Sequence, residues 1–171
     1  MKRTFSIGGV HPADNKISRG CAIETLPTPP TVYISVSQHI GAPAKPIVAV
    51  GDKVLTGQPI AEPGGFVSAY IHSSVSGTVK SIGPRKDLAG NMQTCIEIQV
   101  EGDEWMENID RTDTLVTEFT DDNKVIMDKI KMGGIVGLGG ATFPTHVKLT
   151  PPPGKKCDML IINGCECEPY L

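Results

Sequence analysis

Short runs of β-branched and apolar residues dominate the first hundred residues of the chain, and Gly, Pro, Asp and Asn separate them. The runs cover residues 31–36, 46–50, 54–55, 66–71, 75–82 and 95–100. Runs of this length with turn-forming residues between them are typical of the strands of a small sandwich or barrel. The pattern therefore predicts a compact β domain over residues 31–102, preceded by an N-terminal segment over residues 1–30.

The pattern changes near residue 101, where acidic side chains gather. Between residues 101 and 122 the acidic residues are Glu101, Asp103, Glu104, Glu107, Asp110, Asp113, Glu118, Asp121 and Asp122, and Arg111 is the single base among them. Crowding of like charges is typical of a solvated connector. We therefore expect a domain boundary here, with residues 103–120 as an acidic linker.

Apolar residues recur with helical spacing after this boundary. Asp121 or Asp122 can cap a helix over residues 123–132, and Gly133-Gly134 is a suitable end for it. The elements expected next are a glycine-rich strand and turn over 135–141, a short helix from Pro144 to Leu149, and a buried strand over 159–162. This order predicts that an α/β layer begins in residues 121–171 and is truncated at Leu171.

Composition excludes several classes of protein. The 19 glycines and 14 prolines outnumber the eight aromatic residues, which argues against a helical bundle. A net charge of -3 is too small to suggest a nucleic-acid partner. The longest apolar runs are far shorter than the roughly 20 residues of a membrane-spanning helix. The first residues lack the apolar stretch of a signal peptide. The odd count of five cysteines then predicts free thiols in a reducing compartment.

Two blocks of the β domain resemble the lipoyl and biotinyl carrier family. They are residues 48–62, with turns at Gly51-Asp52 and Gly57-Gln58, and residues 72–82, with a turn at Gly77. A carrier domain attaches its prosthetic group through a lysine at the tip of the hairpin between the blocks, but the tip here, residues 63–70, contains no lysine. We therefore expect a structural module in which His72 is a packing residue.

The stretch from Gly133 to Lys148 is rich in glycine. Gly137, Gly139 and Gly140 let the backbone approach a ligand closely, and a helix that begins near Pro144 favours an anion at the same place. The stretch is neither a P-loop nor a Rossmann fingerprint, because no Gly-Lys-Ser/Thr follows and Thr142 stands where the third glycine is required. Taken alone, it is better explained as a tight turn before a helix than as a ligand site.

A second block, residues 160–171, changes this balance. An apolar strand would deliver Asn163, Glu166 and Glu168 to its carboxyl end, where open α/β sheets bind ligands. Carboxylates at a buried strand end are costly unless they have partners or a function. The two blocks together therefore predict a common ligand site.

The motifs Gly-x-Gly-Gly-Ala-x-Phe-Pro-Thr-x-x-Lys and Asn-x-x-Glu-x-Glu-Pro resemble those of the NADH- and FMN-binding subunit of respiratory complex I. With Gly8-Gly9-Val10-His11-Pro12 and Lys16, the chain more fully resembles the RnfC family, whose members belong to the Rnf complexes, the membrane-associated ferredoxin:NAD oxidoreductases. The resemblance covers essentially the whole chain, as an N-terminal fragment of an RnfC protein. It implies an α+β fold: a lipoyl-like β barrel-sandwich hybrid followed by the beginning of an α/β flavin- and nucleotide-binding domain.

The resemblance also implies roles for individual residues. Gly137, Gly139 and Gly140 would line the FMN phosphate and ribityl chain, and Lys148 would add a positive charge to that phosphate. Phe143 would offer a flat face to the nicotinamide. Asn163 would bond the polar edge of the flavin, while Glu166 and Glu168 would orient the flavin and the nicotinamide carboxamide or ribose. No catalytic side chain is assigned. Cys165 departs from the aspartate usual in complex I, and we expect His146 at the surface.

The implied function is that of an NADH- and FMN-binding electron-transfer subunit, peripheral on the cytoplasmic face of the membrane, in a complex that couples electron transfer to ion translocation. Its cofactors would be FMN and NAD(H). Its partners would be the other Rnf subunits, including the membrane subunits, and ferredoxin indirectly, with no nucleic acid. Two [4Fe-4S] clusters are expected only in a later, missing part, because the five scattered thiols here predict no metal site.

Two alternatives remain. The lipoyl-like module could be the working part, as a non-catalytic assembly module. Covalent attachment of flavin to Thr142 is less favoured, because the flavinylation motif requires Ser or Thr at 139 or 140 and an upstream aspartate. We expect these 171 residues alone to bind FMN weakly and to be inactive, because an incomplete pocket lacks preorganised contacts.

Overall fold

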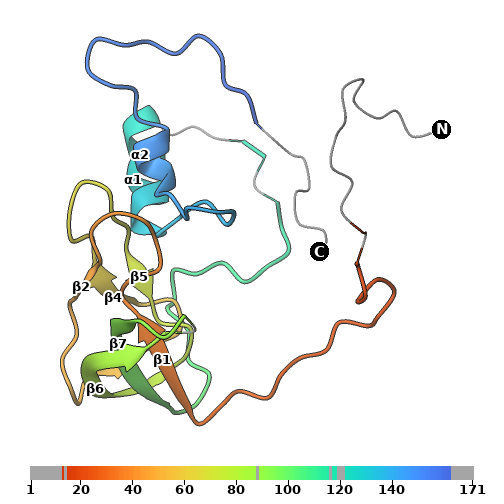
Figure 1. Ribbon diagram of the computed structural model, residues 1–171, viewed down its shortest axis with the longest axis vertical. Helices are drawn as coiled ribbons and strands as arrows, with labels where there is room; N and C mark the ends of the chain where they lie inside the picture. The colour runs from red at the N-terminus through yellow and green to blue at the C-terminus, as the bar shows by residue number, and fades with distance from the viewer. Residues whose placement is uncertain (1–12, 14, 88, 116, 119–121, 163–171) are drawn as a thin grey trace. The chain divides into compact units, whose positions relative to one another are not determined.

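The computed structural model describes residues 13, 15–87, 89–115, 117–118 and 122–162 (Figure 1). The chain divides into two compact units. One unit is Thr28–Lys156, which holds all the helices and strands named below, and the other combines Met1–Pro27 with Cys157–Leu171. Each unit is considered by itself.

Two antiparallel sheets form the first part of Thr28–Lys156, as the sequence predicted (Figure 1). The four-stranded sheet has the order β1-β7-β6-β3, and the three-stranded sheet has the order β2-β4-β5. The strands are β1 (Thr31–Ser35), β2 (Lys45–Pro46), β3 (Lys53–Val54), β4 (Pro59–Glu62), β5 (Ile71–His72), β6 (Gly77–Lys86) and β7 (Met92–Val100). The short strands follow from the frequent glycines and prolines, which interrupt the ladders.

The hydrophobic core lies between the faces of these sheets. Ile60 from β4 and Ile96 and Ile98 from β7 are completely buried, and Val54 and Val79 pack with them. Along β7, Glu97 separates the two isoleucines and points to the opposite face, as the twofold period of a strand requires. Burial of each such side chain stabilises the domain by about 1.5–3 kcal/mol.

Three details of the β domain differ from the prediction. Residues 59–62 form β4, which the prolines at each end had concealed. Residues 66–70 form the loop before β5 instead of a strand. Gly77 begins β6 instead of making a turn, and a methyl group on it would lie 2.0 Å from the carbonyl oxygen of Gln99. This glycine is required because the strands approach closely there.

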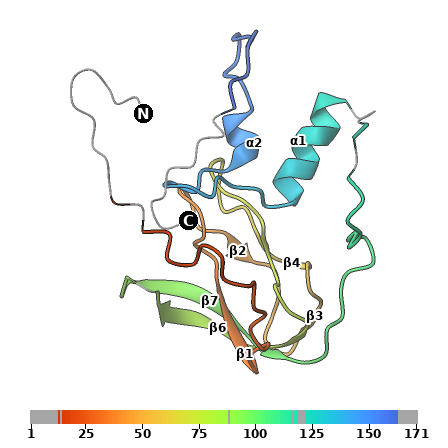
Figure 2. The same ribbon diagram turned by 90° about the vertical axis from the view of Figure 1, so that its right-hand side faces the viewer.

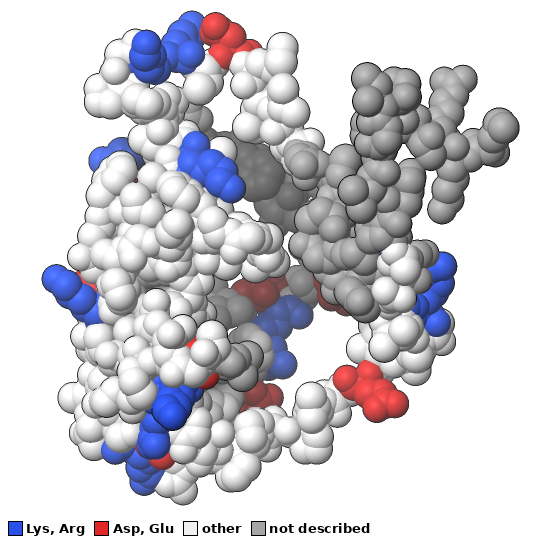
Figure 3. Space-filling model, in the orientation of Figure 1, with Lys and Arg blue, Asp and Glu red and all other residues white. Residues whose placement is uncertain are grey.

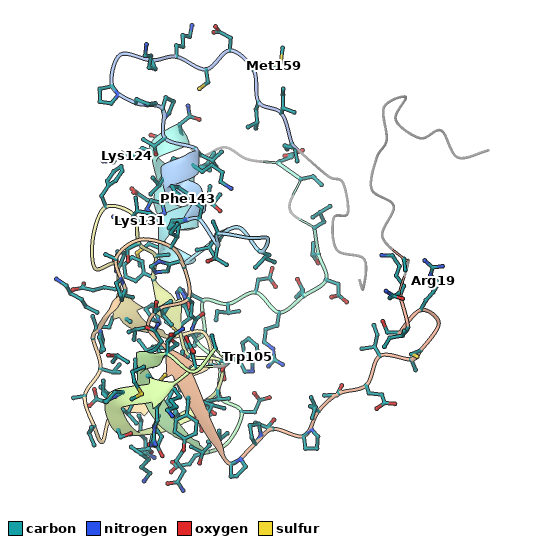
Figure 4. The ribbon with its side chains drawn as sticks, viewed as in Figure 1. Arg19, Trp105, Lys124, Lys131, Phe143 and Met159 are labelled. Atoms are coloured by element: carbon teal, nitrogen blue, oxygen red, sulfur yellow. The ribbon has the colours of Figure 1, made fainter. Side chains whose placement is uncertain are left out.

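The start of the predicted acidic linker packs on the β domain. The Thr56 N–H donates to the Glu104 carbonyl at 2.9 Å, and the Met106 N–H donates to the Thr56 carbonyl at 3.1 Å. The indole of Trp105, labelled in Figure 4, lies 4.4 Å from the guanidinium of Arg111. Residues 104–109 are therefore fixed by backbone bonds, while their charges face solvent. The division of the chain into an acidic linker over 103–120 and flanking domains stays a prediction.

The helix over residues 123–132 is confirmed as α1 (Asn123–Met132). The Asp122 carboxylate accepts the Val125 N–H at 2.8 Å, which caps the helix, and Gly134 follows the end with a φ of +64°. The second helix, α2 (Thr145–Lys148), is shorter than predicted, and Pro144 precedes it as the cap instead of opening its first turn. Figure 2 shows α1 and α2 side by side.

The prediction of a buried strand over residues 159–162 is wrong. These four residues have no regular structure, and they are 72–82% exposed. An apolar strand is stable only where neighbouring strands accept its hydrogen bonds and cover its faces. No described residue provides such a neighbour.

Candidate flavin-binding loop

The glycine-rich stretch folds as a narrow loop with a hydrogen-bonded stem. The Gly137 N–H donates to the Phe143 carbonyl at 3.0 Å, and the Thr145 N–H donates to the Ile135 carbonyl at 2.9 Å. Val136 and the fully buried Pro144 form an antiparallel bridge between these bonds. The predicted strand over 135–141 is therefore reduced to this stem, because the glycines that follow turn the chain back towards α2.

The tip of the loop is open. A methyl group on Gly139 or Gly140 would meet no atom within 4 Å, and Leu138 is 96% exposed. Among the described residues, none accepts a hydrogen bond from the N–H of Gly139 or Gly140. A ligand can thus approach the backbone closely at this point.

Thr142 has an unusual backbone conformation. Its φ of +46° lies in the left-handed region, which β-branched residues rarely adopt. The cost is about 1–3 kcal/mol, and the surrounding structure must offset it. The N–H of Thr142 donates to the Gly139 carbonyl at 3.4 Å, so the strained residue closes the tip.

Three predicted site residues come together at this loop. The ammonium nitrogen of Lys148 lies 3.6 Å from the point where a Cβ on Gly137 would stand, and the backbone of Phe143 lies 3.9 Å from that point. Phe143 is half-buried and is labelled beside the two helices in Figure 4. Lys148 is exposed, and no described carboxylate forms a salt bridge with it. The N–H of Gly137 is already bonded, so Gly139 and Gly140 supply the open donors.

Asn163, Glu166 and Glu168 lie outside the described residues, as does Cys165. Their convergence with the loop therefore stays a prediction. The site that the structure describes consists of the glycine tip, the backbone of Phe143 in the stem and the Lys148 ammonium.

His146 on α2 is half-buried, so its predicted surface position is wrong. Its Nδ1 is buried and has no hydrogen-bond partner among the described residues. Burial, and secondly the positive charge of Lys131, lower the pKa of His146. The packing of α2 against α1 causes this burial, and the sequence contained no signal for it.

The loop is joined to the β domain at a contact that the sequence analysis missed. A methyl group on Gly134 would lie 2.4 Å from the carbonyl oxygen of Tyr70 and 3.3 Å from the ring of His72. Burial lowers the pKa of His72, and a hydrogen bond with the Met132 backbone opposes that effect. The packing role predicted for His72 thus agrees with the structure. Gly133-Gly134 was the only sequence signal for this contact, but a glycine pair is equally expected at an ordinary helix end.

No group of three or more potential metal ligands occurs among the described residues. Cys95 is buried, while Cys21 and Cys157 are exposed, and all three are free thiols. Neither described helix has the length and apolar character that a membrane-spanning helix needs.

Comparison with known proteins identifies both parts of the chain. Residues 4–103 match the RnfC barrel sandwich hybrid domain, which covers more than half of the chain. The chain belongs to the RnfC family. Residues 130–171, which include the glycine loop, match the Nuo51 FMN-binding domain. The fold class is thereby confirmed as an RnfC barrel-sandwich hybrid followed by the start of an FMN-binding domain.

Several curated RnfC relatives match nearly the whole chain. The RnfC protein of the proton-translocating ferredoxin:NAD(+) oxidoreductase complex of Clostridium ljungdahlii is 49% identical over 100% of this chain. Its counterpart in the Na(+)-translocating ferredoxin:NAD(+) oxidoreductase complex of Acetobacterium woodii is 44% identical over 96% of it. The counterpart in the ion-translocating oxidoreductase complex of Pseudomonas aeruginosa is 40% identical over 94%. The chain spans 37%, 37% and 20% of the length of these relatives.

Proposed function

We propose that this chain supplies the FMN-binding loop of an NADH-binding electron-transfer subunit, the RnfC protein of an ion-translocating ferredoxin:NAD oxidoreductase complex. The observation that carries the proposal is the position of the Lys148 ammonium beside the stem of an open glycine loop, within the stretch that matches an FMN-binding domain. The names of the relatives support the wider assignment.

The donors at the loop fit the phosphate of FMN. A phosphate monoester carries negative charge on several acceptor oxygens, and it is best held by backbone N–H groups together with a cation. The open N–H groups of Gly139 and Gly140 supply the former, and Lys148 supplies the latter. The space around both glycines lets the phosphate reach the backbone without meeting a side chain.

FMN held at this site would supply the redox chemistry between a hydride donor and one-electron acceptors. The residues of this chain would bind and orient it. Phe143 would offer its half-buried ring to the nicotinamide and exclude water from one side. Asn163 would bond the flavin edge, and Glu166 and Glu168 would orient the flavin and the nicotinamide. Cys165 would not supply the acidic contact made by the aspartate of complex I.

The remaining partners belong to the same proposal. We place the chain in a protein that is peripheral on the cytoplasmic face of the membrane, in contact with membrane subunits and, through them, with ferredoxin. Two [4Fe-4S] clusters would lie in sequence beyond these residues. Relatives named for protons and for sodium resemble this chain similarly, so we place the choice of ion elsewhere.

A non-catalytic role of the barrel in assembly is the second candidate. It is favoured by Phe66, which is 80% exposed on the loop where carrier domains attach their prosthetic group. A protruding aromatic side chain on a fixed loop is typical of a residue that anchors a protein partner. This role is compatible with flavin binding by the glycine loop.

Flavin titration of the full-length protein tests the proposal. We expect Lys148→Ala to weaken FMN binding about tenfold or more, because a charge-assisted contact is lost. The control is Lys155→Ala, which removes an exposed lysine from the following loop and should bind FMN normally. NADH oxidation with an artificial acceptor should fall in Lys148→Ala and in Glu168→Gln. Failure of the full-length parent to bind FMN would contradict the proposal and favour the assembly role.

A further inference from the structure

Strand β5 is an edge of the three-stranded sheet, so the backbone groups on its outer side need another partner or cover. The segment after α1 provides that cover. Gly134 and Val136 line a cavity of about 220 Å³ together with Tyr70, Ile71 and His72 of the barrel. The chain that leads into the glycine loop thus lies beside the outer edge of β5.

Gly134 is adapted to this contact in two independent ways. Its φ of +64° is strained for any residue with a side chain. A methyl group at this position would also collide with the backbone carbonyl of Tyr70, 2.4 Å away, and press on the ring of His72 at 3.3 Å. This carbonyl belongs to the backbone directly before β5, so it cannot move aside as a flexible side chain can.

His72 joins the barrel to the end of α1. Its ring lies 3.3 Å from the point where a Cβ on Gly134 would stand, and the Met132 backbone, in the last turn of the helix, is close enough to influence the pKa of the ring. The same side chain lines a second cavity of about 470 Å³, which Met132 and Gly133 also line. His72 therefore lines both cavities, and its contacts join the barrel to the end of α1 and to Gly134.

The contact is close to the candidate flavin loop along the chain. Gly134 is followed by Ile135 and Val136, and these residues form the stem through the Thr145 N–H and the bridge to Pro144. A displacement of Gly134 must move the stem, and with it the relation between the glycine tip and Lys148. Displacements of about 1 Å at such sites can weaken function by a hundredfold.

We propose that the β5 edge of the barrel positions the flavin loop, with His72 as the positioning residue and Gly134 as the point of contact. The barrel would then be a scaffold for the cofactor site. The positioning of the loop stands on the contacts above, and its consequence for FMN rests on the proposed function.

Hydrogen exchange of the full-length protein without flavin tests the positioning directly. In His72→Leu we expect the amides of residues 135–145 to exchange about tenfold faster, because the polar contact between the ring and the end of α1 is lost. His72→Gln or His72→Asn should restore slow exchange by supplying an amide N–H. Gly134→Ala should act like His72→Leu, whereas Gly90→Ala, which also has a positive φ but has open space around it, should leave these amides unchanged.

Titration of the same variants with FMN completes the test. We expect weaker binding, by about tenfold or more, in His72→Leu and Gly134→Ala, and normal binding in Gly90→Ala. Unchanged exchange and binding in His72→Leu would overturn the inference, even if Gly134→Ala failed to fold. Faster exchange in the variants of a parent that binds no FMN would support the positioning and overturn the proposed function.

Discussion

The carboxylate of Glu97 lies at the centre of a polar cluster on the outer face of the four-stranded sheet. The Ser81 hydroxyl donates to it at 2.5 Å and the Arg85 guanidinium at 2.9 Å. The same guanidinium stands 4.8 Å from the centre of the Tyr33 ring. The three strands β6, β7 and β1 are thus linked by side chains on the face opposite the core.

Glu97→Gln should reduce the pH dependence of stability. The hydrogen bond from Ser81, and secondly the bond and charge of Arg85, lower the pKa of Glu97 from its ordinary value of 4.5. The carboxylate therefore stabilises the fold above pH 4.5, and this contribution is lost as the pH falls through the lowered pKa. We expect the melting temperatures of the parent and the variant to differ at pH 7 and to converge in strong acid. A constant difference throughout would contradict this role.

His146→Leu should leave the stability at pH 7 unchanged or raise it by about 1 kcal/mol at most, because it removes a buried nitrogen for which the described part of the chain offers no partner. The lowered pKa of His146 means that its neutral form is favoured by folding. The parent should therefore lose stability as the pH falls below 6.5, and the variant should lose less. Urea unfolding at pH 7 and pH 5 measures both effects, and a strongly destabilised variant would show that Nδ1 has a partner.

At the scale of elements, the loop over residues 36–44 packs closely against the loop over residues 63–70. A methyl group on Gly41 would lie 2.2 Å from the Val67 carbonyl, and one on Gly64 would lie 2.0 Å from the Pro43 carbonyl. The Ala69 N–H donates to Nε2 of the buried His39 at 3.1 Å. Because that N–H can only donate, Nε2 must accept, and the ring proton lies on Nδ1, which donates to the Ile40 carbonyl at 3.1 Å.

His39→Leu should destabilise the barrel by about 1–3 kcal/mol, because it leaves the buried Ala69 N–H without an acceptor. His39→Gln should recover part of the loss, since its amide oxygen can accept. Denaturant unfolding of the three proteins measures the differences. Equal stability of the parent and His39→Leu would mean that water replaces the ring at this position.

At the scale of the whole molecule, the hydrophobic core belongs to the barrel. All residues of the core cluster lie between Ile34 and Ile98, and neither α1 nor α2 contains a buried residue. Basic and acidic side chains occur in small separate groups over the face shown in Figure 3, so the net charge of -3 reflects a mixture of signs. The barrel thus has a core of its own, while the helices and the glycine loop depend on further contacts.

These 171 residues alone should bind FMN at least about tenfold more weakly than the full-length protein. The chain spans 37% of the length of two of its relatives, and a site that lacks part of its surroundings must be ordered by the ligand at the expense of affinity. Isothermal titration of both proteins gives the comparison. Equal affinity would show that the loop and the barrel are sufficient for the site.

Local patterns determined much of this protein. The period of apolar residues predicted the β domain, and Asp122 and the glycine pair predicted the bounds of α1, because capping and strand alternation act over a few residues. The missing lysine at the hairpin tip argues against a carrier function, and this stays a prediction. The glycine-rich turn also followed from the local sequence, whereas the role of Lys148 came from the resemblance to the RnfC family and stays a prediction.

Only the tertiary structure decided which distant residues meet. The contact of Gly134 with Tyr70 and the burial of His146 depend on packing between elements, which no local pattern encodes. The segment 159–162 shows the converse: its apolar pattern is that of a strand, yet a strand exists only where another segment pairs with it. Sequence sets what each segment can form, and neighbouring segments decide what it does form, because hydrogen bonds and burial need two partners.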